Sequence, residues 1–286
     1  MVAVGQAGSR FVSNWARFAR ECEAELAVEV ILVHGALSDM PEETDALCCL
    51  SCPEGTTIPR LRAEGVMAAR APIVALTESF CRPGQGWARA IIEARDETDS
   101  LAIGGPISRE SGSRADWALT FVEYGRFMSA GPSGPIYDLS LVNVSYERER
   151  FISVMGEGVR ELSETHVHSD LLAKGEALWL DRGAVMLDDN CCSLGSSFRA
   201  LFHHGRLYGG GRVDGSSAPV RLFRCAVSPL VPLVQFARIR RAASSAGHAA
   251  QLLHCFPQLS LLLVAFAAGE AIGSLLGAGE SAEHWS

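Results

Sequence analysis

The chain has 286 residues and a formal net charge of −8. Hydrophobic residues make up 48% of it, enough for a sizeable core in one large or two small domains. An acidic chain lacks the basic surface that nonspecific nucleic-acid binding needs, so we expect no nucleic-acid partner.

The first half of the chain alternates between helix-like and strand-like segments. VEVILV, residues 28–33, is a compact β-branched run typical of a buried parallel strand. Strand, helix, strand, helix, strand predicts a doubly wound α/β sheet with helices on both faces, in which ligands bind at the carboxyl ends of the strands. The other expected elements are helices over 11–27, 58–71 and 86–95 and strands over 72–77 and 100–107.

The second half is less regular. We expect helices over 116–128 and 163–174, the latter capped by Ser163 and ended by Gly175. Extended structure resumes over 177–187, and HHGRLYGGGRVDGSS, residues 203–217, has the composition of a glycine-rich basic loop.

The C-terminal quarter is strongly apolar. Residues 259–276 carry one charge, Glu270, and are nearly long enough to span a bilayer. Residues 222–236 are apolar but broken by two prolines, and the basic cluster RIRR follows at 238–241. Burial against the domain is one reading, but the pattern favours an interfacial or re-entrant attachment, so we expect a membrane surface as a partner.

Nine cysteines, an odd number, fit free thiols better than a disulfide framework. The N-terminus shows no basic region followed by an apolar core, so we expect a cytosolic rather than a secreted chain. The spacing of Cys48, Cys49 and Cys52, with Cys191 and Cys192 far away, favours free, mostly buried thiols over structural zinc.

Two carboxylates are candidates for chemistry. Glu78 follows the apolar strand IVAL, where it could help bind Mg²⁺ or Mn²⁺ if substrate phosphates supply further ligands; otherwise it is a solvated turn residue. Glu164 lies in the first turn of the expected helix, where an acid also serves simply to balance the helix dipole. His166 and His168 should point to opposite sides of that helix, so they cannot share a metal.

Several motifs in order resemble a family 2-like glycosyltransferase of the bacterial membrane-associated subgroup, with a GT-A fold. They are EVILVHGALSD, IPRLRAEGVMAARAPIVALTESFCRPGQGWARAIIEA, LAIGGPI, NVSYERERF and ETHVHSDLLAKG. The resemblance implies a glycosyltransferase domain over residues 1–215 and an apolar, membrane-associated helical segment over 216–286.

The resemblance also implies roles for particular residues. Glu164 falls on the general base and Glu78 on the metal-binding acidic motif, whose second acid and histidine are replaced here by Ser79 and Phe80. His34 stands where the family has a nucleoside-binding aspartate. Positions implied near the donor or acceptor are Asp39, Arg60, Arg62, Gly105, Asn143 and Arg206.

The function implied is transfer of a hexosyl-type sugar from a nucleotide diphosphate sugar to a glycan, lipid or other cell-surface acceptor, inverting and assisted by Mg²⁺ or Mn²⁺. The expected location is the cytoplasmic face of the cell membrane. Because the acidic motif is degenerate, an inactive glycosyltransferase-like subunit of a polysaccharide assembly system is the alternative. A third reading is a membrane-bound α/β protein that shares only the fold.

Overall fold

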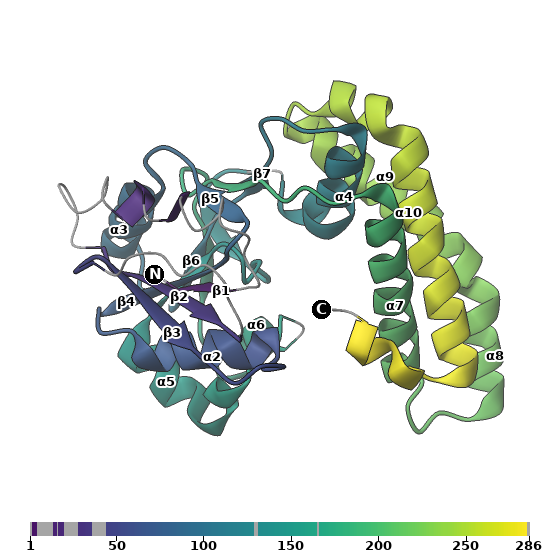
Figure 1. Cartoon of the computed structure of the whole chain (residues 1–286), viewed down its shortest axis with the longest axis horizontal. Helices are drawn as coiled ribbons and strands as arrows, with labels where there is room; N and C mark the ends of the chain where they lie inside the picture. Colours follow the sequence, from purple (N-terminus) through teal and green to yellow (C-terminus); the bar gives the residue numbers. More distant parts are fainter. Residues whose placement is uncertain are drawn as a thin grey trace. The chain divides into compact units, whose positions relative to one another are not determined.

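The computed structural model describes residues 2–4, 14–15, 17–19, 28–35, 44–128, 131–164 and 166–284. The chain divides into two compact units (Figure 1). The first comprises Met1–Ser108 and Ala130–Asp189, and the second Arg109–Ser129 and Asn190–Ser286. The resemblance implies that residues 109–129 and 190–215 belong to the first domain; here they group with the C-terminal helices.

The first unit is built on an eight-stranded, mostly parallel sheet with the order β3-β2-β1-β4-β9-β6-β10-β8. Strands β9 and β8 run antiparallel to their neighbours. The strands are β1 (Val2–Val4), β2 (Val30–His34), β3 (Leu47–Ser51), β4 (Ile73–Glu78), β6 (Ala102–Gly104), β8 (Gly134–Ile136), β9 (Val144–Glu147) and β10 (Leu178–Leu180). A smaller sheet has the order β5-β11-β7, with β5 (Cys81–Pro83), β7 (Ile107–Ser108) and β11 (Met186–Asp188).

The register of the sheet brings two strand ends together. Val4 of β1 pairs with Val33 on one side and with Glu78 on the other, and all three strands are parallel. The carboxyl ends of β2 and β4 therefore flank the end of β1 at one edge. Because side chains alternate along a strand, Val33 and Glu78 point to one face of the sheet and His34 to the opposite face.

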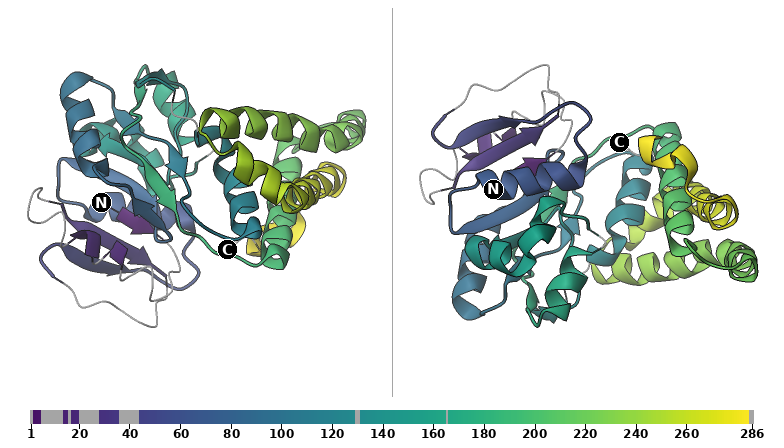
Figure 2. Two further views of the ribbon diagram at one scale, coloured as in Figure 1. Left: turned by 90° about the horizontal axis from the view of Figure 1, so that it is seen from above. Right: turned by 90° about the horizontal axis from the view of Figure 1, so that it is seen from below.

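Helices cover both faces of this sheet, as Figure 1 and Figure 2 show. One face packs into a continuous core against α2 (Ile58–Ala68), α5 (Arg148–Met155) and α6 (Val167–Ala173). Tyr146 lies in that core and stacks on Phe151 with ring centroids 4.1 Å apart. Ser145 alternates to the other face, where Arg95 of α3 (Trp87–Glu97) binds it. The predicted α/β class and sheet type are confirmed.

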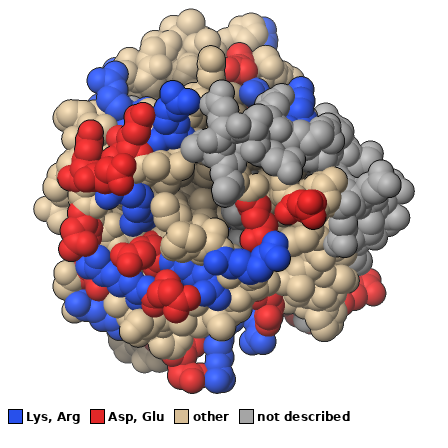
Figure 3. Space-filling view, turned by 90° about the vertical axis from the view of Figure 1, so that its left-hand side faces the viewer, with Lys and Arg blue, Asp and Glu red and all other residues tan. Residues whose placement is uncertain are grey.

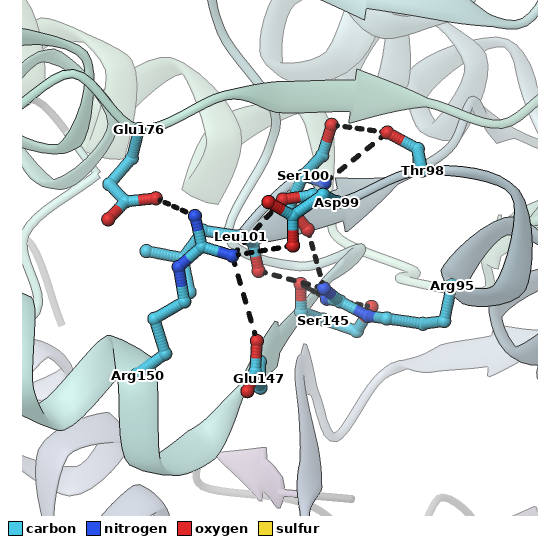
Figure 4. Close-up of polar contacts among 9 residues, drawn as sticks. All are labelled: Arg95, Thr98, Asp99, Ser100, Leu101, Ser145, Glu147, Arg150 and Glu176. Atoms are coloured by element: carbon cyan, nitrogen blue, oxygen red, sulfur yellow. Dashed lines mark hydrogen bonds and ion pairs between the residues drawn. The ribbon is translucent and has the colours of Figure 1, made fainter.

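Two arginines fasten the strand ends opposite the Glu78 edge (Figure 4). Arg95 donates to the carbonyls of Ser100, Leu101 and Ser145, at 2.7, 3.0 and 2.7 Å. Burial lowers the pKa of Arg95 to about 10, so it stays charged at neutral pH. Arg150 binds three acids around the same strands; they are Asp99, Glu147 and Glu176.

The second unit is helical. Its elements are α4 (Arg114–Tyr124), α7 (Leu194–Arg212), α8 (Ala218–Val227), α9 (Val231–Ser245) and α10 (Ala249–Leu276), with short 3₁₀ turns between and after them. Its core joins Trp117 and Phe121 of α4 to Leu259, Leu262 and other apolar side chains of α10.

Helices α7 and α10 lie side by side in this unit and touch through glycines. A Cβ atom on Gly205 would lie 2.1 Å from the carbonyl oxygen of Phe266, and one on Gly269 would lie 2.0 Å from that of Phe202. Only glycine permits this backbone approach. The prediction of a glycine-rich loop over 203–217 is therefore wrong for residues 203–212: these glycines are the contact face of a helix.

Other expected elements are confirmed or corrected. The helix after Pro59, the helix from Trp87 and the strand over 72–77 form as predicted, within a residue or two at their ends. The single strand predicted over 100–107 is instead two short strands, β6 in the large sheet and β7 in the small one. Ser163 does not cap α6; His166 precedes that helix, and Glu164 lies in the turn before it. Gly175 ends the segment with φ +84°, as expected. The expected helix over 11–27 and the loop beyond Gly35 lie largely outside the described residues.

Two stretches of the second unit are long and apolar enough to cross a membrane: Ala218–Ser245 and Ala249–Leu276. They differ in burial, because 56% of the apolar window of the second stretch is buried in the protein and only 11% of the first. The segment predicted to attach to the membrane, residues 259–276, thus contributes much of the core of its own unit.

Candidate functional site

The site begins with an ion pair at the carboxyl end of β4. Arg62 of α2 points from the helix to the sheet, and its Nη2 lies 2.6 Å from Oε1 of Glu78. The Arg62 side chain is 5% exposed and that of Glu78 is 20% exposed. The helix forms after Thr57 with Pro59 in its first turn, which places Arg62 above the strand end.

Two further carboxylates act on Glu78. Burial raises the pKa of the Glu78 carboxyl, Arg62 lowers it, and the charges of Glu164 and Asp188 raise it again. Asp188 ends β11 and is buried. The backbone N–H of Asp189 donates to the carbonyl of Phe80 at 3.1 Å, which holds this strand beside the turn that follows Glu78. Glu78 thus pairs with one buried guanidinium and lies within range of the charges of two further acids.

Glu164, the predicted base, is an exposed side chain in the turn before α6. Its Oε1 accepts hydrogen bonds from Oγ of Ser140 at 3.0 Å and from the backbone N–H of Leu141 at 3.4 Å. A carboxylate that is held through one oxygen and open to solvent can receive a proton from a bound hydroxyl group. The charge of Glu164 reaches Glu78 and raises the pKa of its carboxyl.

Asn143 and Gly105 brace the neighbouring loops. The buried Asn143 accepts from Nε1 of Trp87 at 2.8 Å and donates to the carbonyls of Pro106 and Ala184, at 3.1 and 2.8 Å. A Cβ atom on Gly105 would lie 2.0 Å from the Ala184 carbonyl oxygen. Both residues thus support the packing of these loops. Their predicted nearness to a donor or acceptor stays a prediction.

The remaining predicted residues fall in different places. Arg60 is exposed on α2 and pairs with Glu64 one turn later, at 2.7 Å. Asp39 lies outside the described residues. Arg206 belongs to the second unit, where its Nε donates to the carbonyl of Gly277 and the side chain lines a hollow of about 320 Å³ with His203. The donor contacts of Arg60 and Arg206 stay predictions.

The sequence analysis missed Asp188 as a member of this group. Its signal was available, because VML-Asp188 repeats the pattern of IVAL-Thr-Glu78: an apolar strand that ends in an acid. His166 and His168 differ in burial: His168 is buried beside Tyr146, whereas His166 is exposed. His34 is also buried, and neither of its ring nitrogens has a hydrogen-bond partner among the described residues.

The coordination shell of a divalent cation at this site would have to be completed by the substrate. Among the residues that the structure describes, no three His, Cys, Asp or Glu side chains are placed to hold a metal ion by themselves. Glu78 keeps one-fifth of its side chain exposed, and the repulsion from Glu164 and Asp188 would be relieved by a nearby cation. This donor set fits an ion shared between Glu78 and phosphate oxygens. The eight described cysteines are mostly half-buried.

Charges on the surface are mixed. On the side of the molecule drawn in Figure 3, acidic and basic side chains are interspersed among the described residues. The described residues on this face form no broad basic surface of the kind that follows a nucleic-acid backbone.

Comparison with known proteins identifies the fold. No protein-family model matches the chain, and no curated protein matches its sequence. Among solved structures, the chain is similar to the mannosyltransferase PcManGT of Pyrobaculum calidifontis, solved with GDP-Man and Mn²⁺. The TM-score is 0.53 at 13% identity, over 94% of this chain and 85% of that one. The chain has a GT-A glycosyltransferase fold.

A second structure agrees on the fold. GalNAc-T7, solved with UDP, GalNAc and Mn²⁺, matches with a TM-score of 0.50 at 11% identity. The match covers 65% of this chain and 43% of that one, so this chain spans less than half of the GalNAc-T7 length. At such identities the likeness establishes a glycosyltransferase fold and leaves the reaction to be argued from this chain's own residues.

Proposed function

We propose that the protein is an inverting glycosyltransferase that moves a hexosyl-type sugar from a nucleotide diphosphate sugar to a glycan, lipid or other cell-surface acceptor. One observation carries the proposal. In a GT-A fold, the two acids that the family resemblance assigns to one reaction act on each other: the charge of Glu164 raises the pKa of Glu78 at the carboxyl end of β4. Ligands bind at such strand ends in α/β sheets.

The reaction requires one base and one region of positive charge. Glu164 takes the proton of the acceptor hydroxyl as that oxygen bonds to the anomeric carbon of the sugar, and the bond from this carbon to the diphosphate breaks on the opposite side. Ser140 and Leu141 keep the Glu164 carboxylate oriented through its other oxygen. General-base catalysis of this kind contributes about 10² to 10⁴ in rate.

A divalent cation, Mg²⁺ or Mn²⁺, belongs to the proposal as an ion that arrives with the donor. Both solved neighbours contain Mn²⁺, which supports a cation for this fold. Glu78 would hold it together with donor phosphates, and the ion would neutralise the departing diphosphate. Arg62 orients the Glu78 carboxylate and supplies a fixed positive charge behind it.

The test compares Glu164→Gln with wild-type protein in donor hydrolysis and sugar transfer, with Mn²⁺ present. We expect kcat to fall about 100-fold or more while donor affinity stays unchanged, since a base acts in the chemical step. Glu157→Gln is the matched control, because Glu157 is a surface residue paired with Arg160. Full activity in Glu164→Gln would refute the assignment of the base.

The alternative is an inactive glycosyltransferase-like subunit of a polysaccharide assembly system. Ser79 and Phe80 in place of an acid and a histidine, and the engagement of Glu78 by Arg62, favour it. Such a protein would bind nucleotide sugars but would neither hydrolyse them nor transfer the sugar to any acceptor. Calorimetry and turnover measured on the same preparation separate the two.

We also propose that the second unit binds the cytoplasmic face of the cell membrane, through α8 and α9. This stretch exposes large apolar side chains with exposed arginines nearby in sequence, which suits an anionic lipid surface. The apolar side chains are Val220, Leu222, Phe223, Leu230, Leu233 and Val234. The exposed arginines are Arg238, Arg240 and Arg241.

Vesicle flotation tests the membrane contact. Wild-type protein should float with vesicles that contain anionic lipid, and Phe223→Asp/Leu233→Asp should bind far less. Tyr137→Asp is the control, because Tyr137 is an aromatic residue of the first unit that is even more exposed than Phe223. Recovery of all the wild-type protein in the soluble fraction after lysis without detergent would contradict the proposal.

A further inference from the structure

A buried histidine joins the segment that holds Glu164 to the central sheet. His168 lies in α6 and is 2% exposed. Its Nδ1 is 3.1 Å from Oδ1 of Asp138 and 3.3 Å from the backbone nitrogen of Leu139. Its Nε2 is 2.9 Å from the hydroxyl of Tyr146, which belongs to β9. One imidazole thus contacts a loop on one side and a fixed strand on the other.

The same loop provides the hydrogen bonds to Glu164. Oγ of Ser140 and the backbone N–H of Leu141 are the two donors to Oε1 of Glu164. We call the four consecutive residues 138–141 the clamp segment. His168 contacts one end of this segment, and Glu164 contacts the other end. These two residues are four positions apart, before and within the first turn of α6.

Tyr146 gives this arrangement its fixed reference. It is fully buried, stacks on Phe151, and sits in the core between the sheet and α5. A side chain bonded to its hydroxyl cannot shift without disturbing that core. His168 therefore holds the clamp segment in place relative to the sheet, and the clamp segment holds the Glu164 carboxylate in place.

We propose that His168 is a positioning residue for the glycosyl transfer: by holding the clamp segment it fixes the carboxylate of Glu164 toward the acceptor. The inference rests on the proposed function, in which Glu164 is the base. A displacement of about 1 Å in a catalytic group costs on the order of 100-fold in rate. His168 itself touches no reacting atom.

Kinetics of four variants test the role. His168→Ala should lower kcat about 10-fold to 100-fold with the donor Kd unchanged within twofold, because only the base is misplaced. His168→Asn should recover most of kcat, since the amide nitrogen can replace Nδ1 toward Asp138. His168→Gln, which reaches toward Tyr146 but not Asp138, should recover less. The exposed His166→Ala is the matched control and should turn over within twofold of wild type.

A second measurement does not depend on turnover. Amide hydrogen exchange at Leu139 and Leu141 should speed up about 10-fold or more in His168→Ala and return toward the wild-type rate in His168→Asn, with α5 and β9 unchanged. Unaltered exchange in His168→Ala would refute the clamp even if no donor is ever turned over. Loss of kcat and donor affinity together, or better rescue by Gln than by Asn, would refute the positioning role. Failure of wild-type protein to use any donor would instead count against the proposed function.

Discussion

Replacing Arg62 with methionine should reveal how much the buried ion pair contributes. Methionine keeps the length of the side chain and removes its charge, so Glu78 is left beside Glu164 and Asp188 without the guanidinium 2.6 Å away. Removing one partner of a buried pair costs about 3–5 kcal/mol. Because Glu78 is one-fifth exposed and can be protonated, we expect the lower end, about 3 kcal/mol of unfolding free energy at pH 7.5.

The loss should depend on pH in a defined direction. Burial already raises the pKa of Glu78, and removing Arg62 raises it further. A group whose pKa is higher in the folded than in the unfolded state adds stability below its unfolded pKa and loses it as the pH rises through the folded one. The deficit of Arg62→Met should therefore shrink as the pH falls toward about 4.5, by at most about 1.4 kcal/mol per pH unit.

Urea unfolding of the full chain between pH 4.5 and 8 measures this, followed by circular dichroism. Arg60→Met is the control, since its pair with Glu64 is exposed and worth about 0–1 kcal/mol. The double variant Arg62→Met/Glu78→Gln should regain much of the lost stability at pH 7.5, because it removes both charges of the pair and leaves no unpaired carboxylate at position 78. Equal losses for Arg60→Met and Arg62→Met, or a deficit that does not change with pH, would refute the reasoning.

Two further outcomes follow from the packing. Gly209→Ala should lower the unfolding free energy by about 1–3 kcal/mol, because its Cβ would lie 2.2 Å from the Glu270 carbonyl oxygen. Gly211→Ala, on the same helix with nothing within 4 Å, should instead raise it by up to about 1 kcal/mol; thermal melts that rank the two the other way would contradict the close contact. Burial lowers the pKa of His34 in the folded state. As the pH drops below about 6.5, the unfolded state therefore binds a proton on His34 before the folded state does, and the free energy of unfolding should fall. Urea titrations should find this fall reduced in His34→Phe, and an unchanged pH profile would argue against it.

Much of the first unit could be predicted from sequence periodicity. The β-branched run of β2 and the apolar run of β4 are short and bounded by turn residues, so local patterning suffices to identify them. The pairing of β1 between β2 and β4 could not be predicted, because a three-residue strand carries no pattern and its place is set by long-range hydrogen bonds.

The glycine-rich stretch shows where composition misleads. Gly205, Gly209 and Gly210 have low helix propensity, which favours a loop when the segment is read alone. In the folded chain these glycines let the backbone of α10 pack directly against that of α7, so tertiary packing outweighs their low helix propensity. No local feature of residues 203–212 reveals a partner helix some 60 positions later.

The site was only partly predictable for a similar reason. Glu78 is a candidate from its place after a strand and Glu164 from its place in the first turn of an expected helix, and their roles come from the family resemblance. The pairing of Glu78 with Arg62, the approach of Asp188 and the bridge from His168 to Tyr146 depend on side chains from separate elements meeting in space. A single sequence gives the members of such a group but not their distances.

The most direct test of the central claim is calorimetric binding of a panel of nucleotide diphosphate sugars to the full chain, with and without Mn²⁺, followed by turnover of any that bind. We expect saturable binding of at least one donor, and turnover that Glu164→Gln reduces about 100-fold or more. Absence of binding by every donor, in the presence and absence of Mn²⁺, would contradict it.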